Sequence, residues 1–381
     1  MRAPGAPVRP PVRIGIIGGG AMGRTHARFI AREEHTELVA FADPVSDAAS
    51  RAFRVPNFTD HRALLTMTGL DAVIISNPNS YHVETALDCL IAGIPALLEK
   101  PVAINFAESQ ILAAAAGAST TPILVGHHRR HHPAVSAARH LISSGGLGRI
   151  MAVNGLWLTR KPDSYFEQEW HRSSGAGVML INLVHDLDLI RHLCGEIVSI
   201  QAATSNVLRG HEVEETASVI FELENGALGS FLISDAVVSP WGWDQNTEDD
   251  PTYPYNPSVS CYSIAGTRGS LAFPQMAHYS HDGTPGGGAG STTSDWTQPL
   301  SLTFDTKGTG DSYTNQLRHF VEVVRRETFP LVTVSDAAAT LALIEAAQTA
   351  AATGAAQLCP LRSQATPPTP KVFPDRDGSL L

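Results

Sequence analysis

A glycine-rich turn near the N-terminus has the residue types and spacing of a phosphate-binding loop. Gly18, Gly20 and Gly23 form a G-x-G-x-x-G pattern directly after a short β-branched run. Gly18 permits a tight turn, Gly20 lets a pyrophosphate approach the backbone, and Gly23 allows close helix–strand packing. The amides of Ala21 and Met22, at the positive end of the following helix, then suit the phosphates. The pattern predicts a dinucleotide site; the alternative is a tight turn that binds a flavin or a nucleotide fragment.

An acidic residue after the next apolar run indicates which dinucleotide is bound. Asp43 follows residues 38–42 and stands 20 positions beyond Gly23. A carboxylate there accepts hydrogen bonds from the ribose hydroxyls and repels a 2′-phosphate, so NAD is favoured over NADP as the cofactor. Asp43 could also cap a helix that starts after Pro44, and the two roles are compatible.

A lysine and a histidine further along the chain have the acid–base chemistry that alcohol oxidation requires. A base must take the hydroxyl proton while hydride leaves the same carbon, and imidazole titrates in the useful range, which suits His185. Lys100, before Pro101, could hold the hydroxyl and stabilise negative charge. The alternatives are a solvated lysine and a core histidine bonded to a carbonyl. Asn182, three residues before His185, shares its helix face and is a candidate substrate ligand.

Basic and aromatic residues mark two further candidate substrate contacts. Residues 127–132 read HHRRHH, and the two central arginines repel a cation, so we expect no metal there. We predict instead that Arg129 and Arg130 form an anion- or hydroxyl-binding edge. Tyr165 and Trp170 precede the helix of His185 and either line the pocket or pack as ordinary core or surface residues.

Acidic residues follow His185 closely. Asp186 is a candidate substrate-binding residue, and it or Asp188 could support the imidazole. Both could equally be structural, paired with Arg191 or with a neighbouring strand.

Short apolar runs alternate with helical patterns in the first third of the chain. This alternation predicts parallel strands joined by crossover helices in a doubly wound α/β sheet. We expect strands at 13–17, 38–42, 72–76, 96–98 and 123–125, and helices at 21–31, 82–92 and 106–116 with another from Ser46.

The pattern changes beyond about residue 148, where longer strands are grouped together. A mostly antiparallel, open sheet in an α+β second domain is expected. Its strands are predicted at 150–158, 197–205, 217–223, 227–234, 259–265 and 270–273, with helices at 177–193, 312–326 and 335–353 and loops at 240–257 and 283–295. The predicted domains are a disordered arm (1–12), a Rossmann domain (13–132), a substrate domain (133–361), whose last helices could pack on the Rossmann domain, and a poorly ordered tail (362–381).

Composition and charge exclude several classes of protein. A net charge of −10 argues against nucleic-acid and membrane-surface partners. The proline-rich first dozen residues have no apolar core of a signal peptide, and no segment is a membrane span. The four scattered cysteines show no zinc or disulfide spacing. We expect a cytoplasmic globular protein.

Four stretches together resemble the Gfo/Idh/MocA family of oxidoreductases. They are the glycine turn, the SNPN sequence at 76–79 with His82, the EKP sequence at 99–101, and residues 175–188 with His185. The resemblance implies that Lys100 and His185 are the catalytic pair. It places the cofactor along Asn77, Pro78, His82, Glu99 and Lys100, and implies a cis bond before Pro101. Many relatives carry an aspartate four residues before the histidine, where this chain has Ile181.

These observations favour an NAD-dependent dehydrogenase acting on a secondary hydroxyl of a polyhydroxylated ring: a sugar, sugar acid, cyclitol or cis-dihydrodiol. The alternatives are a non-catalytic NAD-binding sensor and a lyase or hydrolase that recycles NAD. By analogy with relatives, whose second-domain sheet is exposed, we expect a homodimer or homotetramer.

Overall fold

The computed structural model describes residues 9–173, 175–281, 297, 299–306 and 308–359. Most of the predicted arm, the segment 283–295 and the predicted tail 362–381 lie outside the described residues. The chain forms two compact units. Unit 1 comprises residues 1–127, 313–339 and 362–381, and unit 2 comprises residues 128–312 and 340–361.

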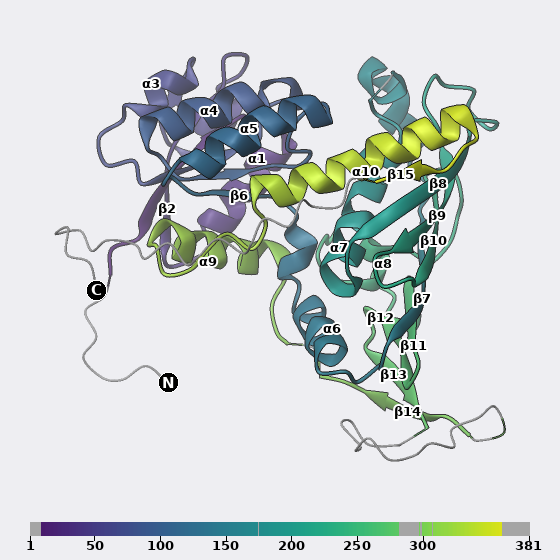
Figure 1. Cartoon of the computed structure of the whole chain (residues 1–381). Coiled ribbons are helices and arrows are strands. Elements are labelled where there is room, and N and C mark those ends of the chain that lie inside the picture. The colour runs from purple at the N-terminus through teal and green to yellow at the C-terminus, as the bar shows by residue number, and fades with distance from the viewer. Residues whose placement is uncertain (1–8, 174, 282–296, 298, 307, 360–381) are drawn as a thin grey trace, which may run out of the picture. The chain divides into compact units, whose positions relative to one another are not determined.

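Unit 1 is built on a six-stranded sheet in which all neighbouring strands are parallel. The strand order β3-β2-β1-β4-β5-β6 means that the chain winds outward in both directions from β1, which confirms the predicted doubly wound fold (Figure 1). The strands are β1 (Val12–Ile17), β2 (Thr36–Ala42), β3 (Asn57–Phe58), β4 (Ala72–Ile75), β5 (Ala96–Leu98) and β6 (Ile123–Val125). The helices are α1 (Ala21–Ile30), α2 (Ala48–Phe53), α3 (His61–Leu65), η1 (Asn79–Tyr81), α4 (His82–Ala92), α5 (Phe106–Ala118) and most of α9 (Ser312–Val324).

Unit 2 is built on a nine-stranded sheet with the order β14-β13-β12-β11-β7-β10-β9-β8-β15. Only β7 and β10 run parallel to each other among these strands, which confirms the predicted mostly antiparallel sheet. The strands are β7 (Ile150–Leu158), β8 (Ile197–Ser205), β9 (Thr216–Leu223), β10 (Leu228–Ser234), β11 (Tyr262–Gly266), β12 (Gly269–Phe273), β13 (Ala277–Ser280), β14 (Ser301–Phe304) and β15 (Gln357–Leu358). The helices are η2 (His128–His131), α6 (Pro133–Ser143), η3 (Asp163–Glu167), η4 (Glu169–Arg172), η5 (Met179–Leu183), α7 (Val184–Cys194), α8 (Trp243–Asn246) and most of α10 (Val334–Thr353).

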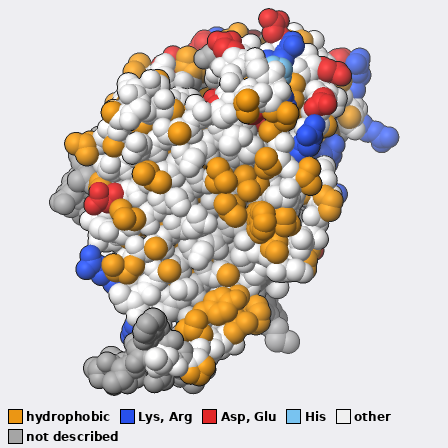
Figure 2. Space-filling view, turned by 90° about the vertical axis from the view of Figure 1, so that its right-hand side faces the viewer, with side chains coloured by type: hydrophobic (Ala, Val, Ile, Leu, Met, Phe, Trp, Pro, Cys, Tyr) orange, Lys and Arg blue, Asp and Glu red, His pale blue; other side chains and the backbone are white. Residues whose placement is uncertain are grey.

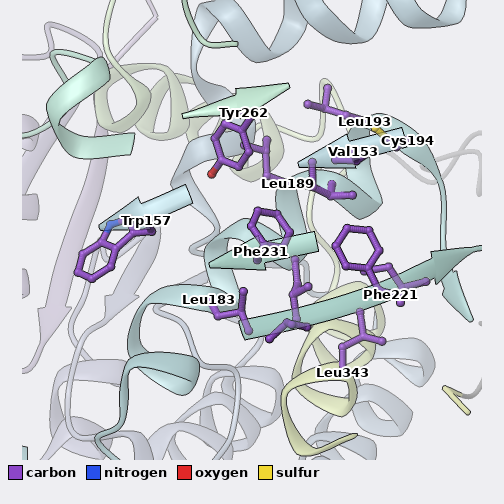
Figure 3. Packing of buried hydrophobic residues seen from close by; sticks show 14 of the residues in the cluster. Val153, Trp157, Leu183, Leu189, Leu193, Cys194, Phe221, Phe231, Tyr262 and Leu343 are labelled. Carbon is purple, nitrogen blue, oxygen red and sulfur yellow. The ribbon is translucent and has the colours of Figure 1, made fainter. Parts of the chain in front are cut away.

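The core of unit 2 fills one face of its sheet. Buried and exposed residues alternate along β9, as expected for a strand with one covered face. Phe221, Phe231 and Tyr262 from three strands pack near Leu189 of α7 and Leu343 of α10 (Figure 3). Figure 1 shows α6 and α7 on this face, while no helix covers the opposite face of the sheet among the described residues. The core therefore fixes α7 against the sheet.

The structure also contains elements that the sequence patterns did not predict. They are the short β3, α3 and β15, the strands β13 and β14 at one end of the nine-stranded sheet, α6, and α8 within the expected loop 240–257. The predicted helix 177–193 begins with the π-helical turn η5 before α7. No helix in the described part of the chain is long and apolar enough to cross a membrane.

Candidate active site

The glycine turn of unit 1 has the geometry that a bound pyrophosphate requires. Gly18 has a φ of 101°, and a Cβ on Gly23 would lie 1.9 Å from the Gly18 carbonyl oxygen, so both positions need glycine. At exposed Gly20, a Cβ would meet nothing within 4 Å. Space is therefore open in front of the amides of Ala21 and Met22, which begin α1 without an acidic side chain in its first turn. The turn fits the phosphates of a dinucleotide.

Asp43 holds the glycine turn and the end of β2 together. Its Oδ2 accepts from the Gly19 amide at 2.8 Å, and its Oδ1 accepts from the amides of Val45 and Ser46. The helix α2 starts only at Ala48 with Asp47 at its N-cap, so the predicted capping role of Asp43 is wrong. Asp43 instead closes the turn that follows β2. Carboxylate oxygens have further lone pairs, so ribose hydroxyls can still be accepted.

The loops after β4 and β5 lie at the same edge of the sheet as the glycine turn. Strands β2, β1, β4 and β5 are parallel neighbours, so their carboxyl ends meet at one edge, where open α/β sheets bind ligands. Asn77 donates from Nδ2 to Thr85 Oγ1, and Pro78 beside it is exposed. Lys100 is half-buried, and the Lys100–Pro101 bond is cis, as the resemblance implied.

Glu99 supports this edge from inside the unit. Its side chain is 9% exposed, its Oε1 lies 2.7 Å from His26 Nε2, and its Oε2 accepts from the Lys100 amide. Burial pushes the pKa of Glu99 upward, but the bond with His26 and its positive charge outweigh burial and hold the pKa below its ordinary value. These bonds give Glu99 a supporting role inside the unit, and its predicted contact with the cofactor stays a prediction.

His82, a predicted cofactor contact, connects two loops inside the unit. Its ring is 1% exposed, with Nδ1 2.7 Å from the Pro101 carbonyl oxygen and Nε2 3.0 Å from the Asn77 carbonyl oxygen. Burial lowers the pKa of His82, although both carbonyl contacts favour its charged form. The ring therefore links the loop after β4 to the loop after β5.

In unit 2, the π-helical turn η5 precedes the candidate base. Such turns occur often at functional sites because they displace side chains from regular helical spacing. His185 lies in the first turn of α7, is buried, and meets His128 edge to face with ring centroids 5.2 Å apart. Asn182 lies in η5 and is half-buried.

The two arginines predicted to bind an anion are occupied inside unit 2. Arg129, 3% exposed, donates from Nη1 to Asp186 Oδ1 at 2.7 Å and to the Tyr262 hydroxyl at 3.2 Å. Arg130 makes a two-pronged ion pair with Asp188. These contacts favour a structural role for both arginines and for Asp186 over the predicted substrate roles. In this structural alternative, Asp186 pairs with Arg129 and Asp188 pairs with Arg130.

Of the two aromatic residues predicted to line the pocket, the structure describes the side chain of Tyr165 only. Tyr165 stacks on His171 with ring centroids 3.7 Å apart and lies 4.7 Å from the ammonium of Lys161. The backbone of Trp170 belongs to η4, but its side chain lies outside what the structure describes.

Comparison with known families decides the class of protein. Residues 12–127 match the Gfo/Idh/MocA model described as an oxidoreductase family with an NAD-binding Rossmann fold. Residues 135–272 match the Gfo/Idh/MocA C-terminal domain. The chain belongs to the Gfo/Idh/MocA family. Unit 1 is therefore an NAD-binding domain, and the protein is an oxidoreductase.

Several Gfo/Idh/MocA proteins of known activity resemble the chain. The scyllo-inositol 2-dehydrogenase (NAD⁺) of Bacillus subtilis is 26% identical over 86% of this chain and 90% of that protein. The levoglucosan dehydrogenase of Pseudarthrobacter phenanthrenivorans is 27% identical over 58% of this chain and 66% of that protein. The WlbA dehydrogenase of Bordetella pertussis, solved with NADH and UDP-GlcNAcA, is 21% identical over 92% of this chain and 99% of that chain, with a TM-score of 0.71. That last likeness shows a shared fold.

Sequence reasoning missed one polar residue of unit 2. Lys161 lies three residues after β7 and is buried, with its ammonium 3.3 Å from both Asn182 Oδ1 and Asp235 Oδ2. Its position just beyond an apolar strand, like that of Lys100, was the available signal. Within the described residues, no group of three or more His, Cys, Asp or Glu side chains could hold a metal ion.

Proposed function

We propose that this Gfo/Idh/MocA protein is an NAD-dependent dehydrogenase that oxidises a secondary hydroxyl of a polyhydroxylated ring. The observation that carries the proposal is the open glycine turn at Gly20, with Asp43 bonded across it to the Gly19 amide. A turn of this geometry accepts a pyrophosphate, and the acid beside it selects NAD. Relatives named inositol and levoglucosan dehydrogenases support a cyclitol or sugar as substrate.

The proposed roles follow from the chemistry of each group. Gly18, Gly20 and Gly23 shape the phosphate site, Ala21 and Met22 donate amides to it, and Asp43 accepts the ribose hydroxyls. Bound NAD supplies the hydride acceptor. His185 takes the hydroxyl proton as the alcohol is oxidised, and Lys100 donates a hydrogen bond to the same oxygen and stabilises its developing negative charge. Asn77 and Pro78 border the cofactor, and Asn182 and Tyr165 contact the substrate.

The proposal is tested by the appearance of NADH absorbance when purified protein is mixed with NAD and a panel of cyclitols, sugars, sugar acids and dihydrodiols. We expect reduction with at least one ring polyol and none with NADP at the same concentration. A His185→Ala variant serves as the matched negative control.

Ile181 favours a second candidate function, a non-catalytic NAD-binding sensor, because an aspartate often occupies this position in relatives. In that case NAD would bind, but no compound in the panel would be oxidised. Substrate turnover without net NADH would instead indicate a lyase or hydrolase that recycles the cofactor.

We further propose that the helix-free face of the nine-stranded sheet binds a second copy of the chain. Ile220, Leu228 and Leu232 project from this face with 53%, 64% and 40% of their surfaces exposed. Across the strand pair, Ile220 faces Ser230 and Leu232 faces Ser218, which are small and uncharged, whereas Leu228 faces the exposed Glu222. Figure 2 shows hydrophobic patches on this face, with charged side chains mainly toward the upper margin. An exposed apolar patch of this kind suits self-association through a two-fold interface.

Light scattering coupled to size-exclusion chromatography tests the pairing of this face. We expect the wild type to be a dimer or tetramer and the Ile220→Glu/Leu232→Glu variant to have a smaller assembly, because the pairing would bury four like charges. A matched variant, Val207→Glu, changes an exposed apolar residue in the loop between β8 and β9 and should keep the wild-type mass. A monomeric wild type would contradict the proposal.

A further inference from the structure

Lys161 is a buried cation whose backbone is fixed by the sheet of unit 2. Its amide donates to the Asp235 carbonyl oxygen at 2.9 Å, which ties the segment after β7 to the segment after β10. The side chain is 10% exposed and that of Asp235 is 5% exposed. Burial lowers the pKa of Lys161, and the Asp235 carboxylate opposes that shift. Holding a lysine here is costly unless its ammonium is well bonded.

The ammonium of Lys161 lies close to two side-chain oxygens and two aromatic rings, of which the Trp157 ring is the more distant, with its centroid 5.7 Å away. Asp235 Oδ2 and Asn182 Oδ1 each lie 3.3 Å away, and the Tyr165 ring centroid lies 4.7 Å away. A protonated lysine offers three donors and no acceptor, and an aromatic face attracts a cation. Because these neighbours surround the ammonium, we expect Lys161 to act on a substrate only through the groups that it holds.

Contact with a pure donor determines which end of the Asn182 amide faces Lys161. The carbonyl oxygen must face the ammonium, so the amide nitrogen with its two hydrogens points away from it. Within the described part of the chain, the Nδ2 group of half-buried Asn182 donates to no protein acceptor. The π-helical turn before His185 therefore presents hydrogen-bond donors.

The surrounding charges disfavour an anionic ligand at these donors. The nearby cations of unit 2 already have carboxylate partners: Arg129 pairs with Asp186, Arg130 with Asp188, and Arg209 with Asp235. Asp244 adds a further negative charge, which slightly opposes the lowering of the Lys161 pKa by burial. A second carboxylate brought in by a substrate would meet like charge in a poorly solvated region.

We propose that Lys161 is a positioning residue that sets the polarity of Asn182, so that the amide donors of Asn182 recognise a hydroxyl oxygen of an uncharged polyol. This inference rests on the proposed dehydrogenase function and narrows its substrate class. It predicts that the enzyme prefers neutral ring polyols to sugar acids as substrates. Lys161 itself does not touch the substrate.

A double-mutant cycle with the Lys161→Met, Asn182→Leu and combined variants tests the inference. Steady-state kinetics would use the best neutral polyol found for the wild type. We expect each single substitution to raise KM by about tenfold, which corresponds to ~1.4 kcal/mol, and to change kcat far less. Because Lys161 acts through Asn182, the double variant should be no worse than Asn182→Leu alone. Lys161→Arg should restore part of the affinity, and a sugar acid of the same ring should be a poorer wild-type substrate.

Three results would overturn the inference: an unchanged KM for Lys161→Met, multiplicative effects in the double variant, or a wild-type preference for the sugar acid. NAD affinity and thermal melting identify a variant that fails to fold. Should Lys161→Met do so, Asn182→Asp replaces the donors by an acceptor beside the same lysine and should raise KM at least as much; an unchanged KM would again refute the inference. A wild type that oxidises nothing would refute the dehydrogenase proposal, whereas an active wild type with unaffected variants refutes only the role of Lys161.

Discussion

At the scale of single residues, the two proposed catalytic side chains are held in different ways. Lys100 is half-buried on the loop after β5, where the Glu99 carboxylate accepts its amide hydrogen. His185 is buried in the first turn of α7 and packs edge to face with His128. A lysine on a loop keeps the freedom to meet a substrate hydroxyl, whereas a histidine fixed by a helix keeps its ring direction. Each arrangement suits the role proposed for it.

Replacing Lys100 by alanine should separate catalysis from cofactor binding. The variant loses the proposed donor to the reacting oxygen, so turnover should fall by about 10²–10⁴-fold. NAD affinity should stay near wild type, because the phosphate and ribose contacts lie on other loops. Initial rates and a calorimetric titration with NAD measure the two effects. Near-normal turnover would remove Lys100 from the mechanism.

Local sequence patterns were enough to single out the glycine turn and its neighbouring acid, whose roles toward NAD are proposals. Gly18, Gly23 and Asp43 are tied to positions just after strands, where steric and bonding requirements are strict. The internal pairing of Arg129 was not predicted because its partner Asp186 lies 57 residues away, and no local pattern reports such a pairing. For Lys161, the position just after a strand was visible in the sequence, but its contact with Asn182, 21 residues further along, was not.

At the scale of elements, buried ion pairs join η2 to α7 and thereby fix the helix that carries His185. Arg129 lies over the Trp243 ring at 5.2 Å and pairs with Asp186, while Arg130 pairs with Asp188. Burial and the Asp186 charge raise the pKa of Tyr262 well above its ordinary value, so its hydroxyl stays protonated and donates to Asp186. These bonds satisfy groups that would otherwise be buried without partners.

Arg129→Met should destabilise the protein by about 3–5 kcal/mol, because it leaves the Asp186 carboxylate buried without its cation. The double variant Arg129→Met/Asp186→Leu removes both charges, so its free energy of unfolding should fall much less than that of the single variant. Urea unfolding followed by circular dichroism measures the free energy of unfolding of each variant. Equal losses in the single and double variants would show that the ion pair is not the source of the effect.

The bond between Glu99 and His26 makes the stability of unit 1 depend on pH. The folded pKa of Glu99 is lowered, so the unfolded chain binds more protons between the folded pKa and the ordinary value of 4.5. The contribution is complete above pH 4.5 and is lost as pH falls through the folded pKa. The difference in unfolding free energy between wild type and Glu99→Gln should therefore shrink on acidification below pH 4.5. A difference that is constant with pH would contradict the assignment.

The elements that sequence reasoning missed are those with weak local patterns. Strands β3 and β15 have two residues each, too few to show periodicity. The π-helical turn η5 was predicted as regular helix, because its wider turn is set by packing around it and leaves no mark in the order of apolar residues. Helix α6 follows directly on residues 127–132. The charges of that segment were interpreted as a ligand site, and no helix was predicted after it.

At the scale of the whole molecule, the alternation of strands and helices in one half and the grouping of strands in the other were enough to predict both sheets. The match to the Gfo/Idh/MocA family then indicates what both domains do together, which is NAD-linked oxidation or reduction. Much of the proposed chemistry depends on the glycine turn of unit 1, because a dehydrogenase without a cofactor site transfers no hydride.

Calorimetric titration of NAD into the wild type and the Gly20→Val variant tests this central claim most directly. Gly20 has an ordinary φ of −67° and open space where a Cβ would stand, so the variant should fold and melt like the wild type. As a contrast, Gly23→Val should disturb the turn itself, because its Cβ would clash with the Gly18 carbonyl oxygen. We predict that the wild type binds NAD and that the folded Gly20→Val variant does not. Equal binding by both, or no binding by the wild type, would contradict the account.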